Sequence, residues 1–344
     1  MTEDTGPVAG SVSDPSTGGA EVTAGGPPER FAGPRGNRSV RVQELAVVGI
    51  CIALFIALSI ASSSFLTTLN IKNILDQNAA VGIIACGETL VIISGSFDLS
   101  VGAIFAFAGL VAVLLSNDIG PAPAMLIAVL AGVGLGVANG VLVVVGRVHS
   151  FIATLASQYV FNGLALVISG GLIVLAKSPS FTNLGQQSGL GLNYTIWSFI
   201  GVAVLTSLVL MRTPWGRYIF AVGGNLEAAR LSGIRVGLIR GSVFALCGGT
   251  AAFAGVVAAS RVGTAQAGTG TGLELAAIAT TVLGGTSIFG GEGAIWRTIL
   301  GVLLLAMIGN GFDLLSISAT YQQIVQGVLI IFAVVIDAYT RLRR

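Results

Sequence analysis

Residues 74–116 read ILDQNAAVGIIACGETLVIISGSFDLSVGAIFAFAGLVAVLLS. The stretch holds two apolar runs, 74–95 and 99–116, each close to the roughly 20 residues that a helix needs to cross about 30 Å of hydrocarbon. Only the tetrapeptide GSFD, 95–98, separates them. Because every backbone polar group must be paired internally within a bilayer, apolar runs of this length form helices. The stretch therefore predicts two membrane spans, or two broken segments, joined by a short turn that carries an acid.

Similar apolar runs follow one another along the chain. Of the 344 residues, 54% are hydrophobic and 9% are charged, and the mean hydropathy is +0.91. Soluble domains carry about 25% charged residues, so most of this chain faces lipid. We predict an all-α, polytopic membrane helix bundle of about ten transmembrane helices. The predicted spans cover 45–65, 74–95, 99–116, 121–145, 150–175, 194–211, 240–261, 273–289, 294–312 and 321–338.

Both ends of the chain are polar. Residues 1–44 are rich in Gly, Pro, Ser and Thr and bury too little apolar surface to offset the entropy of ordering, so a disordered cytoplasmic tail is predicted. The transmembrane domain is predicted over 45–338, and 339–344 form a short basic cytoplasmic tail. The first apolar run begins too late for a secretory signal peptide, so it is expected to remain as an anchor.

The basic residues predict the orientation, because Lys and Arg are retained in cytoplasmic loops. With the N-terminus inside, Lys72, Lys177 and Arg261 are the three of the 17 basic residues that fall outside, and the other fourteen fall inside. Both termini are therefore predicted to be cytoplasmic, with an even number of spans. The polar stretch 212–240 becomes a cytoplasmic loop, and about 176–193 becomes the longest external loop.

Several functions are disfavoured by what the sequence lacks. A net charge of +2 gives no indication of nucleic-acid binding. No Gly-rich loop is followed by Lys and Ser or Thr, so the chain has no ATPase motif of its own and is not expected to be an enzyme. Cys51, Cys86 and Cys247 lie in separate apolar runs and His149 is the only histidine, so no catalytic residue, metal site or bound cofactor is expected.

Ionisable side chains inside spans are rare and usually face a cavity or the bundle interior. Asp76, Glu88, Asp98 and Glu274 are such residues, and Glu88 lies deepest. Both a structural role and a pathway role are open for them.

Three Asn-Gly pairs also lie within apolar runs, at 139–140, 162–163 and 310–311. Each amide must find a partner, next to a glycine that permits close helix approach. Helix packing is the simpler explanation. The alternative is an uncharged polar lining, which suits a hydroxyl-rich solute better than an ion.

The cytoplasmic stretch GGNLEAARLSGIR, residues 223–235, is typical of a short amphipathic helix. Asn225 is the predicted N-cap, Glu227 lies near the positive end of the helix dipole, and Gly233 ends the helix. A charged loop that fixes topology would explain this pattern. A docking element for a cytoplasmic partner is the alternative.

A weak internal echo links 95–104 with 285–295, since each joins two apolar runs through Gly and an acid and resumes with Gly-Ala-Ile. The span count places both on the same side of the membrane. Broken segments at corresponding positions are the expected sign of a transport path.

Three ordered blocks resemble a known family. Residues 92–102 resemble the G-x-x-D-L-S-V-G signature of permeases from ribose-type ATP-binding-cassette (ABC) sugar importers. Residues 227–233 match the E-A-A-x-x-x-G core that importer permeases present to their ATPase, and 282–293 match a third block. The resemblance covers about 70–338. Branched-chain amino-acid permeases share a weaker form of the pattern, and 98–102 favours the sugar branch.

The resemblance implies a type II importer-like permease that acts as a dimer, expected to be a homodimer. It would take a monosaccharide from an extracytoplasmic sugar-binding protein. A separate cytoplasmic ATPase with two nucleotide-binding halves would drive it, so ATP would be used by that partner. The chain would lie in the inner or plasma membrane. The polar tail, 1–44, is a departure from the family core.

These patterns give two expected sites. The expected ATPase-coupling surface comprises Glu227, Ala228, Ala229 and Gly233. The expected translocation path comprises Glu88, Asp98, Asn162, Glu274 and Asn310, with close backbone approach at Gly284, Gly285, Gly290 and Gly291.

Other functions fit the same features. The solute could be a polyol, a nucleoside or a branched-chain amino acid. A self-contained secondary transporter would use Glu88 or Asp98 to carry a coupling proton. A membrane-embedded enzyme would need at least two carboxyl groups at facing depth.

Overall fold

A computed structural model describes residues 38–342, and it is almost entirely helical. The first helices are α1 (Arg38–Ala61), α2 (Thr68–Ile93), α3 (Val101–Ile119), α4 (Pro121–Val144), α5 (Ser150–Ser169), α6 (Pro179–Gln186) and α7 (Tyr194–Arg212). The others are α8 (Pro214–Gly224), α9 (Leu226–Leu231), α10 (Val236–Val262), α11 (Leu273–Leu283), α12 (Ile295–Leu314) and α13 (Ala319–Leu342). Two small antiparallel pairs are formed by β1 (Val174–Leu175) with β4 (Thr264–Ala265), and by β2 (Ser188–Gly189) with β3 (Leu192–Asn193).

The helices confirm the predicted polytopic bundle. Among the described helices, seven are long and apolar enough to cross a membrane, namely α2, α3, α4, α5, α7, α10 and α12. Each coincides with a predicted span. The other three predicted spans fall on α1, whose apolar part is Val47–Ala61, on the short apolar helix α11, and on α13.

The eighth predicted span, 273–289, is wrong in extent. Its helix α11 has 11 residues, which corresponds to about 16 Å at about 1.5 Å per residue and is too short to cross the hydrocarbon. The helix stops at Gly284, and Gly285 follows with a φ of 97°. Hydropathy alone missed this end, because the residues after it are still mostly uncharged. The alternative of a broken segment is the one that the structure shows.

Four segments predicted as tails or loops contain regular structure. The first helix begins at Arg38, so the end of the predicted tail 1–44 is helical, and 1–37 lie outside the described residues. Helix α13 runs to Leu342, so the predicted tail 339–344 is largely helical, with 343–344 outside the described range. The predicted loop 212–240 contains α8 and α9, and the external loop 176–193 contains α6 and the β2–β3 hairpin.

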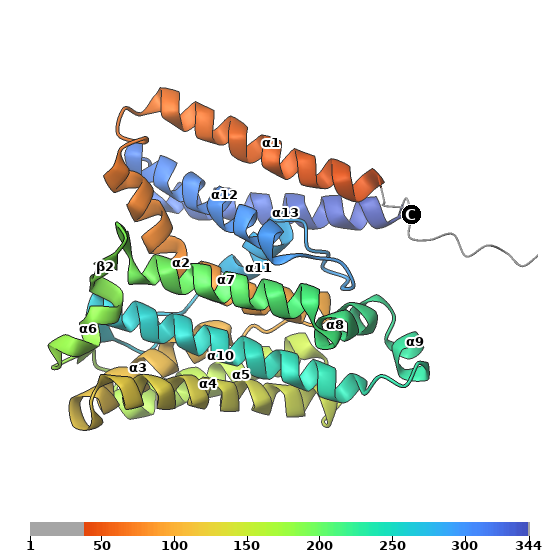
Figure 1. Ribbon diagram of the computed structural model, residues 1–344, viewed down its shortest axis with the longest axis horizontal. Coiled ribbons are helices and arrows are strands. Elements are labelled where there is room, and N and C mark those ends of the chain that lie inside the picture. Colours follow the sequence, from red (N-terminus) through yellow and green to blue (C-terminus); the bar gives the residue numbers. More distant parts are fainter. Residues whose placement is uncertain (1–37, 343–344) are drawn as a thin grey trace, which may run out of the picture. The chain divides into compact units, whose positions relative to one another are not determined.

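The two ends of the bundle differ. In Figure 1 the first turns of α1, helices α8 and α9, and the described end of α13 lie at one end, while α6 and β2 lie at the other. We call these the α9 end and the α6 end. The orientation predicted from the basic residues places the α9 end in the cytoplasm.

Helix α10 is the centre of the packing and contacts α2, α3 and α4. Its contact with α4 is made by glycines: a methyl group on Gly136 would overlap the carbonyl oxygen of Phe244, and one on Gly248 would overlap that of Gly132. Small residues at such positions let two helix backbones approach closely within a membrane, where dispersion replaces the hydrophobic effect as the attraction.

The buried apolar side chains form two clusters. The larger one joins α2, α3, α4, α7 and α10 through residues such as Ile83, Ile104 and Phe244. The smaller one joins α1, α12 and the first turns of α2 through Cys51, Leu58, Ile74, Leu304 and Met307, together with Phe65 and Ala306. Cys51, Cys86 and Cys247 are all buried and unbridged, as their apolar surroundings predicted.

Asp76 is held by an ion pair near the α6 end. The guanidinium Nε of Arg261, in the last turn of α10, lies 2.7 Å from its Oδ2 atom, and the Thr195 hydroxyl donates to its Oδ1 atom. The pair ties α2 to α10 and α7. Asp76 is therefore a structural side chain in this bundle.

The contact between α4 and α10 gives the first prediction. Gly136→Ala should destabilise the purified protein by about 1–3 kcal/mol, because the added methyl group has no room. The matched control is Gly134→Ala on the same helix, where a methyl group would meet nothing within 4 Å. That control should leave the thermal-unfolding midpoint unchanged or raise it, because Ala favours helix over Gly. Equal midpoints for the two variants would contradict the packing described here.

Candidate translocation and coupling site

The turn between α2 and α3 folds back into the bundle. Ser96, Asp98, Leu99 and Ser100 of this turn are buried, and four successive N–H groups, from Phe97 to Ser100, donate to side-chain oxygens. The pairs are Phe97 to Ser150 Oγ at 3.2 Å, Asp98 to Glu88 Oε1 at 3.2 Å, Leu99 to Thr154 Oγ1 at 3.0 Å, and Ser100 to Asp98 Oδ1 at 2.9 Å.

Glu88 and Asp98, two of the expected path residues, meet each other at this turn. Both are fully buried. Asp98 Oδ1 also accepts from the Ser100 hydroxyl at 2.6 Å, and Asn139 Nδ2 donates to the same hydroxyl at 2.7 Å. The Cys247 thiol lies 3.7 Å from Glu88 Oε2. The carboxyl groups thus fasten the turn to α2, α4 and α10.

The start of the half-helix α11 is fixed by Glu274. Its Oε1 atom accepts from Gln158 Nε2 on α5 at 3.0 Å, and its Oε2 atom accepts from the N–H of Gly272 at 3.1 Å. Glu274 is buried, and a carboxylate in the first turn of a helix also suits the helix dipole. Asn162 lies one turn beyond Gln158 on α5 and is half-buried.

A cluster of threonine hydroxyls holds the inner part of α11. Thr89 of α2 lies 2.7 Å from Thr298 of α12 and 3.4 Å from Thr281 of α11, measured between hydroxyl oxygens. All three side chains are buried. Thr89 therefore joins α2 to both α11 and α12, and the half-helix itself is attached to α2.

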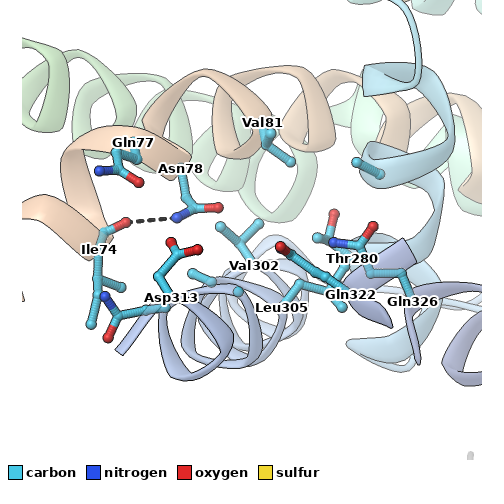
Figure 2. A pocket seen from close by; sticks show the side chains of 14 residues that line it. Ile74, Gln77, Asn78, Val81, Thr280, Val302, Leu305, Asp313, Gln322 and Gln326 are labelled. Atoms are coloured by element: carbon cyan, nitrogen blue, oxygen red, sulfur yellow. Dashed lines mark hydrogen bonds between the residues drawn. The ribbon is translucent and has the colours of Figure 1, made fainter. Parts of the chain in front are cut away.

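A cavity of about 230 Å³ lies between α2, α11, α12 and α13. Figure 2 shows Asn78, Asp313 and Gln322 pointing into the same space. Gln77, Gln326, Thr280 and Asn310 add further polar groups, and Ile74, Val81, Val302 and Leu305 form apolar wall. The cavity is smaller than the roughly 300–1,000 Å³ typical of drug-sized ligands, so it suits a small polar solute.

Asn310 lies on the wall of this cavity and is also paired with Asn70. The two amides exchange hydrogen bonds, with Asn70 Nδ2 to Asn310 Oδ1 at 2.9 Å and Asn310 Nδ2 to Asn70 Oδ1 at 2.8 Å. Asn310 therefore fits both explanations for the Asn-Gly pairs, helix packing and a polar lining. It joins α12 to α2, and it contributes to the wall of the cavity.

Helix α9 has the predicted caps. Asn225 Oδ1 accepts from the N–H of Ala228 at 2.9 Å, and Gly233 follows the helix with a φ of 82°. Of the expected coupling residues, Glu227 and Ala228 are exposed, whereas Ala229 is only 4% exposed and packs against the bundle. Leu231, which was not among the expected residues, is 87% exposed.

Five glycines bring the end of α8 against the two broken segments. We call Gly95, Gly223, Gly224, Gly290 and Gly291 the glycine junction. The N–H of Gly291 donates to the carbonyl of Ile93 at the end of α2, at 2.8 Å, and a methyl group on Gly223 would overlap that same carbonyl. Gly95, Gly290 and Gly291 have φ values of 77°, 82° and 77°, which favour glycine. The predicted echo segments therefore do lie on one side, in contact.

Gly284 and Gly285 lie beside this junction. A methyl group on Gly284 would overlap the carbonyl of Arg297, so the end of α11 packs closely on α12. The expected path residues thus fall into separate groups. Glu88 and Asp98 fasten the turn, Glu274 fixes α11, Asn310 reaches the cavity, and the four glycines form backbone contacts at the α9 end.

The cavity residues Asn78, Gln322 and Gln326 were missed from the sequence. Gln322 and Gln326 are four residues apart in an apolar span, which places them on one helix face and is the signal that could have found them. Ser150 and Thr154 were missed as well, because side chains that accept backbone hydrogen bonds are invisible without the fold.

Comparison with known proteins places the chain in a family. Residues 70–334 match the family model described as branched-chain amino acid transport system / permease component. The chain is 41% identical over 287 residues to the ribose import permease protein of Bacillus subtilis, covering 83% of this chain and 89% of that relative. It is 39% identical over 293 residues to the D-allose transport system permease protein of Escherichia coli, covering 85% of this chain and 89% of that relative.

A third relative is the L-arabinose ABC transporter permease protein of Azospirillum brasilense, 38% identical over 304 residues, or 88% of this chain and 90% of the relative. No solved structure matches the chain. The matched range contains six of the seven described helices that are long and apolar enough to span a membrane, and all of α2 except its first two residues. The chain is therefore a multi-pass inner-membrane protein that belongs to the family of branched-chain amino acid transport system permease components.

Proposed function

We propose that the chain is the permease subunit of an ABC importer that carries a monosaccharide. The observation that carries this proposal is the similarity to permeases named for ribose, L-arabinose and D-allose over more than four-fifths of the chain. In the proposed unit, two permease chains receive the sugar from an extracytoplasmic binding protein. A separate cytoplasmic ATPase with two nucleotide-binding halves supplies the energy, so ATP is used by that partner.

The cavity between α2, α11, α12 and α13 supports a sugar as the solute. Its wall holds amides, which offer both donors and acceptors to hydroxyl groups. Asp313 is the one acidic residue among the 14 that line it, and none is Lys or Arg, so nothing there selects an anion. We place the outer part of the sugar path in this cavity.

The lining amide Gln322 gives a test of this path. Gln322→Leu should reduce ribose, L-arabinose or D-allose uptake in proteoliposomes that hold the whole importer, because an apolar side chain cannot replace a hydrogen bond to the sugar. A lost bond of about 0.5–1.5 kcal/mol corresponds to roughly 2- to 12-fold in transport. Gln323→Leu is the matched control, since Gln323 is exposed and outside the cavity wall. Equal uptake by the two variants would remove the cavity from the path.

Helix α9 supports coupling to an external ATPase. It lies at the α9 end, and its exposed residues Glu227, Ala228 and Leu231 offer an acid, a small residue and an apolar side chain to a partner. Glu227 is bridged to Arg230 at 3.0 Å, but both side chains are largely exposed, so this ion pair contributes little to stability and is available for exchange.

A double replacement tests the coupling surface. Glu227→Ala with Gly233→Val removes an exposed acid and forces a β-branched residue into a left-handed backbone, at a cost of about 1–3 kcal/mol. ATPase co-purification and sugar uptake should both fall, while membrane insertion is retained. The matched control is Asp118→Ala with Gly120→Val at the α6 end, where Gly120 has a φ of 86°. Unchanged ATPase co-purification in the first double variant would refute the coupling claim.

The glycine junction offers a route from α9 to the path. Helix α9 follows α8 after a single residue, and α8 ends at Gly223 and Gly224. Those glycines touch the turns that follow α2 and α11. We propose that a movement of α9 driven by the ATPase is transmitted through this junction to the broken segments, so that the bundle opens first to one face and then to the other.

Replacing Gly223 or Gly224 distinguishes an effect on this route from an effect on ATPase docking. Gly223→Ala should lower sugar uptake by about tenfold or more. Its added methyl group overlaps the carbonyl of Ile93, and the resulting steric strain of about 1–3 kcal/mol is relieved when the glycine junction opens. The ATPase should still co-purify, since the exposed face of α9 is unchanged. Gly224→Ala is the control, because a methyl group there meets nothing within 4 Å. Loss of uptake in both variants would contradict the proposed route.

A further inference from the structure

A second and larger groove lies at the α9 end, between α4, the start of α5 and the start of α10. Its volume is about 1330 Å³. Of the path and coupling residues discussed above, Gly95, Ser150 and Arg230 also line this groove. The proposed sugar path and the proposed coupling surface therefore do not account for the rest of this groove.

The groove is strongly basic at one end. Arg147, Arg230, Arg235, Arg240 and His149 line it, and its lining contains no Asp or Glu. Arg230 is paired with Glu227, whereas Arg147, Arg235 and Arg240 have no carboxylate of the described residues within 4.0 Å. Arg240 is instead held by the Ser96 hydroxyl, 2.8 Å from its Nη2 atom.

Two helices begin at the same place. Helix α5 starts at Ser150 and α10 starts at Val236, with His149 and Arg235 as their N-cap residues. Neither cap residue makes a side-chain hydrogen bond to the helix, so the first N–H groups add a positive field to that of the arginines. The carbonyls of Val141 and Leu142 near the end of α4 are already occupied by backbone N–H groups of 145, 146 and 148, so they offset this field only in part.

The other end of the groove is apolar and belongs to the outside of a span. Val137, Val141 and Val145 lie along one stripe of α4 and are 46%, 51% and 74% exposed. The stripe runs about 12 Å along the outer face of α4 from the end of that helix, at about 1.5 Å per residue. Because α4 is a candidate membrane span, these valines face hydrocarbon when the chain is in a bilayer.

We propose that this groove is a binding site for an anionic phospholipid of the cytoplasmic leaflet, with the phosphate against Arg147 and Arg235 and one acyl chain along the valine stripe of α4. The charge complementarity identifies the headgroup, since positive groups gather there with no acid among the lining residues. The continuous apolar wall identifies a lipid, because a soluble anion or an acidic loop of the ATPase would leave these valines uncovered.

Fluorescence quenching can test this site, because Trp215 lies beside the groove. Its indole N–H donates to the hydroxyl of Ser242, a lining residue, at 2.8 Å. With Trp197→Phe and Trp296→Phe as background, Trp215 is the single remaining tryptophan. The full-length permease is reconstituted in phosphatidylcholine vesicles that contain brominated phosphatidylglycerol or, at the same fraction, brominated phosphatidylcholine. We expect brominated phosphatidylglycerol to be the stronger quencher.

Charge removal should abolish this preference. Arg147→Gln with Arg235→Gln should lower the association constant of brominated phosphatidylglycerol relative to phosphatidylcholine by about fivefold for each arginine removed. Arg147→Lys with Arg235→Lys should keep most of the preference, and quenching by brominated phosphatidylcholine should not change in either variant. Arg212→Gln with Arg217→Gln is the matched control, because both arginines are exposed at the α9 end and lie outside the groove.

Three results would overturn the proposal. The first is equal quenching by the two brominated lipids in the parent protein. The second is a preference for phosphatidylglycerol that survives in Arg147→Gln with Arg235→Gln, or that is lost equally in the control. If Arg147→Gln with Arg235→Gln keeps the lipid preference but fails to retain the ATPase, the groove is a protein-docking site. The third is displacement of brominated phosphatidylglycerol by inorganic phosphate or glycerol phosphate as effectively as by unlabelled phosphatidylglycerol, which would make the ligand a soluble anion.

Discussion

The structure depends on one constraint: a backbone that leaves helical geometry inside a membrane must find partners for its N–H groups in the protein itself. The turn after α2 meets this constraint with four side-chain acceptors, supplied by α2, α5 and the turn itself. An unpaired donor at this depth would cost several kcal/mol. Glu88 and Asp98 are buried for this reason, and neither carboxyl is placed as a water-accessible proton carrier.

The same turn contacts α8 and the turn that follows α11 through backbone atoms of the glycine junction. Gly291 is bonded to Ile93, and Gly223 and Gly290 approach the chain on either side of it so closely that a side chain would not fit. Contacts without side chains have no rotamers to absorb a displacement. We propose that a shift of α8 is passed on in this way to the turns that follow α2 and α11, which is the property that a coupling element requires.

The sequence predicted the parts of this protein that local chemistry decides. The capped helix from Asn225 to Gly233 followed from short-range rules, and the spans followed from hydropathy. The role of a side chain whose partner lies far away in the sequence could not be predicted. The amide of Asn310 pairs with Asn70, 240 positions away, and α11 ends before Gly284, which packs closely against Arg297 of α12. Periodicity could not tell that Ala229 faces the bundle, since its neighbour Ala228 has the same chemistry.

The cavity lies at the seam between the two buried clusters. Ile74 on its wall belongs to the smaller cluster, around α1 and α12, and Val302 belongs to the larger one. Helices α2 and α12 each contribute to both clusters, so the cavity is a gap inside one bundle and not a boundary between two bodies. At its wall the apolar packing of the bundle gives way to amide side chains, so a polar solute would fill a space that the bundle itself leaves open.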